Sequence, residues 1–447
     1  MWTLHVEDFG RIEKADITVS PLTLFVGDNN SGKSYLLSLI YGILCADDVL
    51  SDLCEDSDEY RTCAAWAEKA LAQGKQLGDA EIPFDDYAYT IFENLFNRIL
   101  ENNQKDIFRA IFNADISAGK ISVTFPRGEG ETLRLIFEQD KLGSLNLSFA
   151  FLMAFVNTFA QSPKGNEKAV ISIVLKGMLI RGFSHLHELF NIVFLPTARS
   201  GLLLTYKALA KDAFSRAYKL NQKYDLLLAR PFTDFLGNLA TVNSERVYSK
   251  REFIVRFMED NIIHGRVIVS NDTPLPDFYY IPEKLDISFP MFLASDVVKQ
   301  MTPLLATLKH QPMDALFIEE PEISLHLELQ QMIARVLIKL VNDGIPVIAA
   351  THSDTILQHV NNMIKLNNLP AARKQTLMNR FDFDYDDPIS ADKISVYQFD
   401  VQDDGKTAVR ALTHGDYGFE VPTFYDPLET LLEQTRATEP DAEEYEA

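Results

Sequence analysis

Apolar and polar positions alternate along the chain in blocks that predict strands and helices in turn. Residues 4–10 and 12–19 alternate well enough to predict a two-stranded hairpin, and residues 22–26 form a short, fully apolar run. Residues 35–41 then show the character of a helix. The chain is therefore expected to begin with a β-sheet whose third strand leads directly into a helix.

Two groups of elements are predicted in the middle of the chain. Residues 47–113 are acidic and helix-like, with a linker at residues 78–83, and suggest an inserted helical lobe. Strand-like runs follow at residues 121–125, 132–137 and 145–149, before a long apolar helix that ends near residue 182. Beyond residue 201 we expect a basic helix at 202–224, helices at 231–239 and 251–262, and strands at 267–270 and 278–281.

Short apolar runs return in the rest of the chain, each ending at polar residues. Residues 191–196, 315–318 and 345–350 have the pattern of buried strands. Strands are also predicted at 393–399 and 407–412, followed by a helix at 427–434 and an acidic tail that is expected to be disordered. Strands that alternate with helices in this way predict an α/β fold.

Residues 27–34 read G-x-x-x-x-G-K-S and lie between the predicted third strand and the first helix. The two glycines allow the turns by which a loop aims successive N–H groups at a phosphate. The lysine is expected to reach β- and γ-phosphate oxygens, and the serine hydroxyl to ligate Mg²⁺. A chance glycine turn would rarely fall between a strand and a helix. The nucleotide-binding residues expected here are Gly27, Asn29, Asn30, Ser31, Gly32, Lys33, Ser34 and Tyr35.

The apolar run at residues 315–318 ends in two carboxylates, Glu319 and Glu320. A buried strand that delivers acids to its end has the form of a Walker B element. Glu319 is expected to hold Mg²⁺, directly or through water, and Glu320 to orient or deprotonate the attacking water. The alternative is a solvated acidic turn that opens the next helix.

Two further polar residues follow predicted strands. His352 comes directly after residues 345–350, and its imidazole is expected to hydrogen-bond a γ-phosphate, although a lone histidine at a strand end is more often structural. Arg199 follows residues 191–196 at a strand end, where ligand sites of α/β proteins lie. The sequence leaves open whether Arg199 faces a phosphate or is an ordinary surface arginine.

Charge and composition narrow the choice of partners and compartment. The net charge of −22 disfavours broad contact with nucleic acid, so such contact must be local. Residues 199–256 hold eleven Lys or Arg against five Asp or Glu, a balance of +6, and either form a local nucleic-acid contact or pair with acidic segments. No apolar run is long enough to span a membrane, and the N-terminus lacks a signal peptide, which predicts a cytoplasmic protein. The three cysteines, Cys45, Cys54 and Cys63, lack zinc spacing and predict reduced structural thiols.

Four of these stretches together resemble the ABC-type head ATPases of the RecF and structural-maintenance-of-chromosomes (SMC) class. The chain is similar also to the overcoming-lysogenisation-defect nucleases and to the ATPase subunits of the antiphage systems Septu and PARIS. The matching stretches are residues 27–34, 195–201, 316–322 and 350–354. The resemblance implies a P-loop NTPase fold of ABC/SMC-head type, with a mixed sheet and helical insertions. It also implies that His352 acts as a switch histidine.

In that family a signature loop at a helix N-terminus contacts the nucleotide of the partner subunit. The matching place here is residues 293–300, where Ser295 is the expected contact and Asp296 stands in place of a glycine. The acid Glu319 likewise replaces the usual aspartate of Walker B. The resemblance implies a homodimer or higher homo-oligomer with composite ATP sites.

The resemblance also gives a division of the chain. We expect an N-terminal part of the head with Walker A at 1–46, a helical insertion at 47–118, a continuation of the head at 119–201, a basic lobe at 202–284, the signature, Walker B and switch-histidine part at 285–400, and a C-terminal segment with an acidic tail at 401–447. Neither a Toprim nuclease pattern nor a convincing H-N-H pattern is found in the sequence. A separate effector, such as a nuclease, is therefore expected.

Three functions compete on this basis. The favoured one is a Mg²⁺-dependent ATPase that serves as the sensor or motor subunit of an antiphage or DNA-repair-like complex. The ATP-binding subunit of a transporter is an alternative, but it is usually smaller and keeps the L-S-G-G-Q letters. A small-molecule P-loop kinase is the other alternative, but it has no reason to carry the acids of residues 319–320 together with a switch histidine.

Overall fold

A nine-stranded sheet forms the centre of the protein, in the order β5-β1-β2-β16-β15-β3-β14-β13-β9. The computed structural model describes residues 2–45, 52–138, 141–148, 150–155, 166–181, 191–217, 228–415, 418–420 and 432–435. The strands of the sheet are β1 (Thr3–Phe9), β2 (Ile12–Thr18), β3 (Leu22–Gly27), β5 (Lys120–Thr124), β9 (Ile192–Leu195), β13 (Ala315–Glu319), β14 (Val347–Ala350), β15 (Ile394–Val401) and β16 (Thr407–Leu412).

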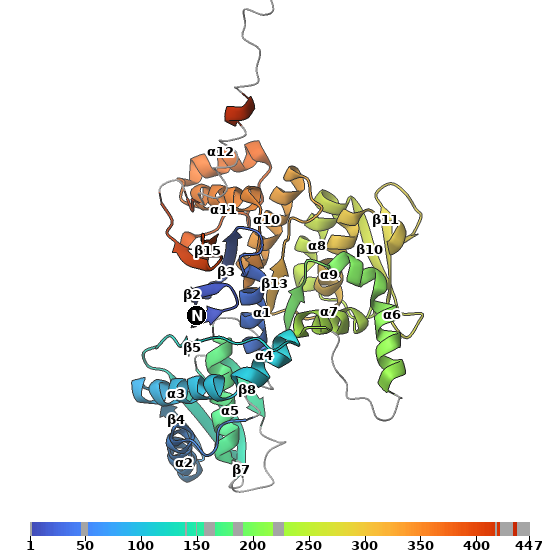
Figure 1. Cartoon of the computed structure of the whole chain (residues 1–447). Helices are drawn as coiled ribbons and strands as arrows, with labels where there is room; N and C mark the ends of the chain where they lie inside the picture. Colours follow the sequence, from blue (N-terminus) through green and yellow to red (C-terminus); the bar gives the residue numbers. More distant parts are fainter. Residues whose placement is uncertain are drawn as a thin grey trace, which may run out of the picture.

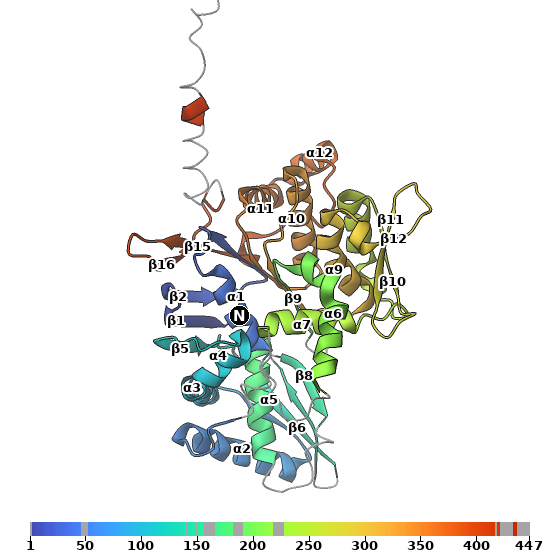
Figure 2. The ribbon, with the colours of Figure 1, turned by 45° about the vertical axis from the view of Figure 1, so that its right-hand side comes forward.

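The two halves of this sheet differ in direction. Strands β15, β3, β14, β13 and β9 pair in parallel. Strand β1 instead pairs antiparallel with both β2 and β5, which lie on either side of it in Figure 2. Since β14 lies between β3 and β13, the carboxyl ends of these three strands are neighbours. Ligand sites of open α/β sheets lie at this edge.

Both faces of the parallel half are buried, which explains why β9, β14 and β13 up to its terminal Glu319 are apolar rather than alternating. Phe25 and Phe317 pack into one core with helix α1 (Lys33–Leu44). Leu24 and Leu316 pack into the other core. That second core is completed by α9 (Asp296–His310), α10 (Leu327–Asn342) and α11 (Asp354–Asn367).

The first lobe lies below the central sheet in Figure 1 and carries a second sheet, in the order β4-β6-β7-β8. Its elements are α2 (Asp58–Leu77), β4 (Asp79–Pro83), α3 (Asp86–Asn102), α4 (Gln104–Phe112), β6 (Thr132–Glu138), β7 (Lys141–Leu147), β8 (Ala150–Phe155) and α5 (Asn166–Ile180). The indole of Trp2 donates to Leu179 O at 2.8 Å and so joins β1's end of the central sheet to α5.

Two predictions need correction in this lobe. The segment at residues 78–83 is strand β4 rather than a linker. Strands β6, β7 and β8 form a sheet with β4 and are not part of the central sheet, so only part of residues 119–201 continues the head. Apolar alternation fixes which face of a strand is buried, but it carries no information about which strand is its neighbour.

The second lobe stands beside the parallel half and contains a three-stranded sheet, β10-β11-β12 (Figure 1). Its elements are α6 (Arg199–Ala217), α7 (Arg230–Ala240), α8 (Glu252–Met258), a π-helix (Glu259–Ile263), β10 (Gly265–Ser270), β11 (Asp277–Pro282) and β12 (Phe289–Pro290). Helix α12 (Ala371–Phe381) and short 3₁₀ turns at Ser249–Arg251, Met291–Leu293 and Ala391–Lys393 complete the described elements.

The topology has the features of a P-loop NTPase. A buried strand, β3, leads through a glycine loop into α1. The strand with the acidic end, β13, is separated from β3 by β14 alone. The predicted α/β fold of the P-loop NTPase kind, with a mixed sheet and helical insertions, is confirmed, whereas the ABC/SMC-head type stays a prediction. Of the predicted helix at residues 427–434 the structure describes 432–434, which are helical; the remainder lies outside the described residues.

Candidate nucleotide site

The loop after β3 adopts a backbone that depends on its glycines. Gly27 has a φ of 124°, and a Cβ there would lie 2.3 Å from Phe399 O of β15. Gly32 has a φ of 95° and directly precedes α1. Positive φ at both positions and the close approach to β15 exclude larger side chains. The glycines expected from the motif are thus explained by the fold of the loop itself.

The Lys33 side chain is folded inside this loop. Its ammonium donates to Gly27 O at 3.1 Å, to Asp28 O at 2.5 Å and to the Ser31 hydroxyl at 3.1 Å. Burial lowers the pKa of Lys33 to about 8, against the opposing effect of the acids Asp28, Glu320 and Glu322. The ammonium is therefore held where a loop of backbone N–H groups would receive phosphate oxygens.

The other expected P-loop residues line the opening of the loop. Asn29 and Asn30 are exposed, and Asn30 has a φ of 59°. Ser34 is exposed in the first turn of α1, so its hydroxyl is accessible. The exposed ring of Tyr35 packs against Phe9 and Phe112 at the side of the loop.

The strand β13 ends in the two predicted acids, which differ in their surroundings. Glu319 is buried, and its Oε2 accepts from the Thr197 N–H at 3.0 Å and from the Thr197 hydroxyl at 3.3 Å. Glu320 has a φ of 41°, in the left-handed region that is strained for a side chain of this size. Its N–H donates to Ala350 O of β14 at 2.8 Å, which fixes the turn.

His352 follows β14 and reaches the P-loop. Its Nδ1 lies 3.0 Å from Gly27 O, so this nitrogen carries a proton and donates it to the carbonyl. Burial, and then the charge of Lys33, lower the pKa of His352. At neutral pH the imidazole is therefore largely neutral and its Nε2 is left for another partner.

Arg199 does not occupy the position predicted for a phosphate ligand. Its side chain is fully buried, and its guanidinium donates to the carbonyls of Glu319 at 2.8 Å and Glu320 at 3.0 Å. It donates further to Pro196 O and to Gln300 O of α9. Since these four hydrogen bonds all go to protein carbonyls, the phosphate-facing prediction is corrected to a supporting position behind Walker B.

Ser295 is the N-cap of α9. Its hydroxyl accepts from the Val298 N–H at 3.4 Å, and the residue is exposed. The neighbouring Asp296 accepts a hydrogen bond from the Ser324 hydroxyl in the loop after Walker B. The exposed N-terminus of a 15-residue helix can receive an anion from outside the chain.

One acid of the site was missed by sequence reasoning. The carboxylate of Glu322 accepts from the Thr351 hydroxyl at 2.8 Å and from the His352 N–H at 2.6 Å. A third acid in the letters E-E-P-E was the available signal, but the sequence does not show that it would point toward β14.

The donor set fits a nucleotide with Mg²⁺. The loop supplies backbone N–H groups and the Lys33 ammonium for phosphates, while Ser34 and Glu319 supply the hard oxygen ligands that Mg²⁺ prefers. The loop and α1 follow β3, and Glu319 ends β13. The carboxyl ends of these two parallel strands lie at one edge of the sheet.

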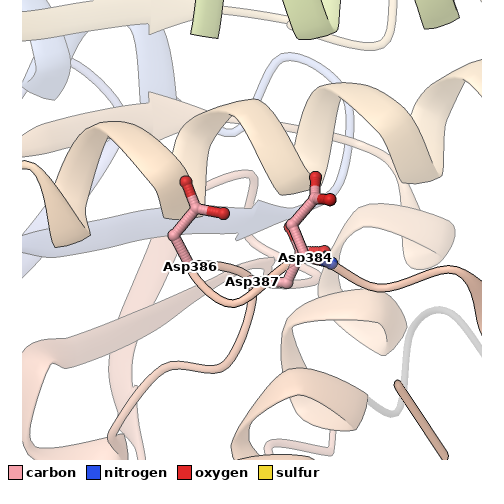
Figure 3. A group of neighbouring side chains, drawn as sticks. All are labelled: Asp384, Asp386 and Asp387. Carbon is pink, nitrogen blue, oxygen red and sulfur yellow. Dashed lines mark hydrogen bonds between the residues drawn. The ribbon is translucent and has the colours of Figure 1, made fainter. Parts of the chain in front are cut away.

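A separate acidic group, Asp384, Asp386 and Asp387, lies against α10 (Figure 3). Lys339 pairs with all three acids, at 2.9, 2.5 and 3.1 Å, and Arg335 pairs with Asp387 at 2.7 Å. Two buried cations thus compensate two of the three negative charges. The group is a structural ion-pair cluster that fastens the loop after α12 to α10.

Several basic residues of the second lobe also have local acidic partners. Lys207 pairs with Asp277 at 2.5 Å, and Arg256 pairs with Glu252 at 2.5 Å. Such pairs favour the interpretation in which the excess of six positive charges in residues 199–256 is compensated by acidic residues rather than by nucleic acid. Residues 218–227, which hold part of the basic span, lie outside the described residues.

Comparisons with known proteins agree with the kind of fold. Residues 176–358, from α5 to α11, match the family described as "AAA domain, putative AbiEii toxin, Type IV TA system". This match includes Walker B and His352 but not the P-loop. No curated protein sequence matches the chain. In the part of the chain that is described, no helix has the length and apolarity needed to cross a membrane.

Solved structures of Smc heads are similar at low sequence identity. The Smc head bound to the C-winged helix domain of ScpA has 14% identity and a TM-score of 0.38, over 92% of this chain and 97% of that chain. The SMC head from Thermotoga maritima has 13% identity and a TM-score of 0.34, over 92% and 98%. An Smc head with an extended coiled coil, bound to the C-terminal domain of ScpA derived from Pyrococcus furiosus, has 13% identity and a TM-score of 0.37, over 98% and 100%. These values are too low to support an argument about function.

Proposed function

We propose that the protein binds ATP with Mg²⁺ and hydrolyses it. The observation that carries this proposal is the contact that joins the phosphate-binding loop to the loop after β13. The Nδ1 of His352 lies 3.0 Å from Gly27 O, and the His352 N–H donates to Glu322 at 2.6 Å. Because β14 is the only strand between β3 and β13, the two motifs form one site. Phosphoryl transfer is catalysed by this combination of positioned cation and carboxylate.

Each residue then has a separate task. Lys33 exchanges its acceptors within the loop for β- and γ-phosphate oxygens, and Glu320 orients or deprotonates the attacking water. Bound Mg²⁺ supplies the charge that neutralises the phosphates, held by Ser34 and Glu319. His352 offers Nε2 at the site, because its Nδ1 is already bonded to Gly27 O.

Hydrolysis is proposed to require a second copy of the chain. Ser295 and the N-terminus of α9 are exposed, and a helix N-terminus can receive phosphate oxygens, which supports a role in completing the site of a partner copy. The resulting homodimer, or a higher homo-oligomer built from it, has composite ATP sites. The protein would then hydrolyse ATP only when it is assembled.

The biological role that we propose is the sensor or motor subunit of an antiphage or DNA-repair-like complex. The match to a family described by a toxin–antitoxin system is consistent with a defence role. The effector, such as a nuclease, is proposed to be a separate protein. The C-terminal residues 421–447 hold eight acids and one arginine, which suits docking of a basic partner, although such tails also serve solubility alone.

Two variants test the ATPase proposal by separating binding from hydrolysis. Lys33→Ala is expected to abolish ATP binding, since the loop loses its only side-chain cation for phosphate. Glu320→Gln is expected to bind ATP but to turn it over at least about 100-fold more slowly. Binding is measured with a fluorescent ATP analogue and turnover by phosphate release.

Glu328→Gln, in an exposed acid of α10, is the matched control and should retain wild-type turnover. Wild-type turnover by the Glu320→Gln protein would show that Glu320 is not the residue that orients or deprotonates the attacking water. Failure of the wild-type protein to bind ATP with Mg²⁺ would reject the proposed function as a whole.

A further inference from the structure

The carboxylate of Glu322 joins two loops that approach the nucleotide site from different strands. Glu322 belongs to the loop after β13, and its two acceptor bonds end on Thr351 and His352, directly after β14. The residue is partly buried, and burial raises the pKa of its carboxyl. A carboxylate that accepts a hydroxyl and a backbone N–H at 2.6–2.8 Å makes stronger bonds than a neutral acceptor.

The carboxylate of Glu322 is one of the contacts that hold the loop after β14, beside the bond from the Thr351 N–H to Phe25 O at 2.9 Å. The Thr351 hydroxyl donates to Glu322 and accepts from the Ser353 N–H at 3.0 Å. It therefore links Glu322 to Ser353. The Ser353 hydroxyl in turn caps α11 by accepting from the Ile356 N–H and donates to Gln330 of α10 at 2.6 Å. Residues 351–353 are therefore held in a continuous chain of hydrogen bonds that begins at Glu322.

The same loop carries the imidazole that touches the P-loop. His352 uses its backbone N–H for Glu322 and its Nδ1 for Gly27 O. Because the backbone of His352 is fixed on one side and its ring on the other, the direction of Nε2 is determined by both contacts. Loss of the Glu322 contact would leave only the ring contact to position the residue.

Glu322 also supports a strained neighbour. Glu320 keeps a φ of 41°, a conformation that persists only where surrounding contacts enforce it. The enforcing contacts on the β14 side are the bond from the Glu320 N–H to Ala350 O and the two bonds of Glu322. The catalytic carboxylate and the imidazole therefore share one set of supports.

We propose that Glu322 is a positioning residue, which fixes His352 against the P-loop and holds the turn of Glu320 in the conformation needed for hydrolysis. This inference rests on the proposed ATPase function, but the hydrogen bonds that it invokes exist without nucleotide. Glu322 is not proposed as the base, since its oxygens are already engaged by Thr351 and His352. Its effect should fall on turnover and not on nucleotide affinity.

Three variants test the proposal. Glu322→Ala removes both acceptors and is expected to lower kcat about 10- to 100-fold, because small misplacements of catalytic groups cost rates of this order, with KM nearly unchanged. Glu322→Gln keeps one oxygen for the His352 N–H and places its amide against the Thr351 hydroxyl, which can accept. It should restore most of the rate. Glu328→Ala is the exposed control and should leave kcat unchanged.

A second measurement does not depend on ATPase activity. Hydrogen–deuterium exchange of the nucleotide-free protein should show faster exchange at residues 351–353 in Glu322→Ala than in wild type, Glu322→Gln or Glu328→Ala. Unchanged exchange, or faster exchange with unchanged kcat, would overturn the proposal, as would an equal loss of kcat in the Gln and Ala variants. If wild type shows no turnover, the ATPase proposal fails, and the positioning role for hydrolysis fails with it, while the exchange data still show whether Glu322 fixes the loop.

Discussion

Burial decides the charge of Lys33, the residue on which phosphate binding is expected to depend. In the nucleotide-free protein its pKa is about 8, well below the ordinary value of 10.5. Bound phosphates favour the ammonium form and so raise this pKa in the complex. Above pH 8 the free protein has lost the proton that the complex needs, so binding then requires proton uptake.

The affinity for ATP should therefore fall with rising pH. It is expected to be constant below about pH 7.5 and to weaken about tenfold between pH 7 and pH 9, since one proton is taken up per nucleotide above pH 8. The measurement is titration with a fluorescent ATP analogue across this range. His352→Gln is the control and should keep the slope, because the lowered pKa of His352 places its titration below this window. An affinity that does not vary from pH 7 to pH 9 would contradict the prediction.

Single residues also show how far the sequence alone can predict the site. Spacing was enough to place Lys33, Glu320 and His352 on neighbouring strand ends, because parallel strands deliver their carboxyl ends to one edge. The sequence did not predict the supporting role of Arg199, nor any role for Glu322. Apart from one threonine hydroxyl, their partners are carbonyls and N–H groups from other segments, and backbone groups leave no trace in the letters of a sequence.

At the scale of elements, Arg199 joins three segments around Walker B. It begins α6, donates to the carbonyls that end β13, and donates to Gln300 O on α9. Burial lowers its pKa to about 10, which still leaves it charged at neutral pH. A buried cation satisfied by carbonyls of separate elements stabilises their relative placement.

Replacement of Arg199 should therefore destabilise the fold. Arg199→Met leaves several carbonyls without their donor and is expected to lower the free energy of unfolding by about 3 kcal/mol or more. The measurement is urea unfolding followed by circular dichroism. Arg256→Met, which removes an exposed arginine paired with Glu252, is the matched control and should cost less than about 1 kcal/mol. Equal stability of the two variants would show that the Arg199 bonds contribute little.

Elements were predicted better than their pairing. The strands at residues 121–125, 132–137 and 267–270 were placed closely by their apolar pattern, and β5, β6 and β10 occupy those positions. The assignment of β6 to the head was wrong, since it pairs with β4 and β7. A strand buried on one face fits either sheet, and the choice is made by helices α2 and α5, which cover the second sheet.

At the scale of the whole molecule, the proposed composite site has two parts. The P-loop and Walker B are proposed to bind the nucleotide of the chain itself, whereas the exposed Ser295 at the start of α9 is proposed to contact the nucleotide of a partner copy. Asp296 adds a negative charge beside this helix N-terminus, where glycine would leave the N–H groups open. The charge should weaken anion binding there, so closure of a dimer around ATP is expected to be less stable than with glycine.

ATP should therefore drive assembly only when hydrolysis is blocked. Glu320→Gln with ATP and Mg²⁺ is expected to double its mass in solution, because the ATP-bound dimer cannot hydrolyse its nucleotide and dissociate. The mass is measured by light scattering after size exclusion. Ser295→Arg added to Glu320→Gln should prevent the doubling while ATP binding is retained, since the bulky cation fills the contact with the partner. Gln375→Arg, at an exposed position on α12, is the matched control and should permit it. An unchanged mass of Glu320→Gln with and without ATP, despite ATP binding, would reject the composite site, and doubling that survives Ser295→Arg would exclude α9 as its contact.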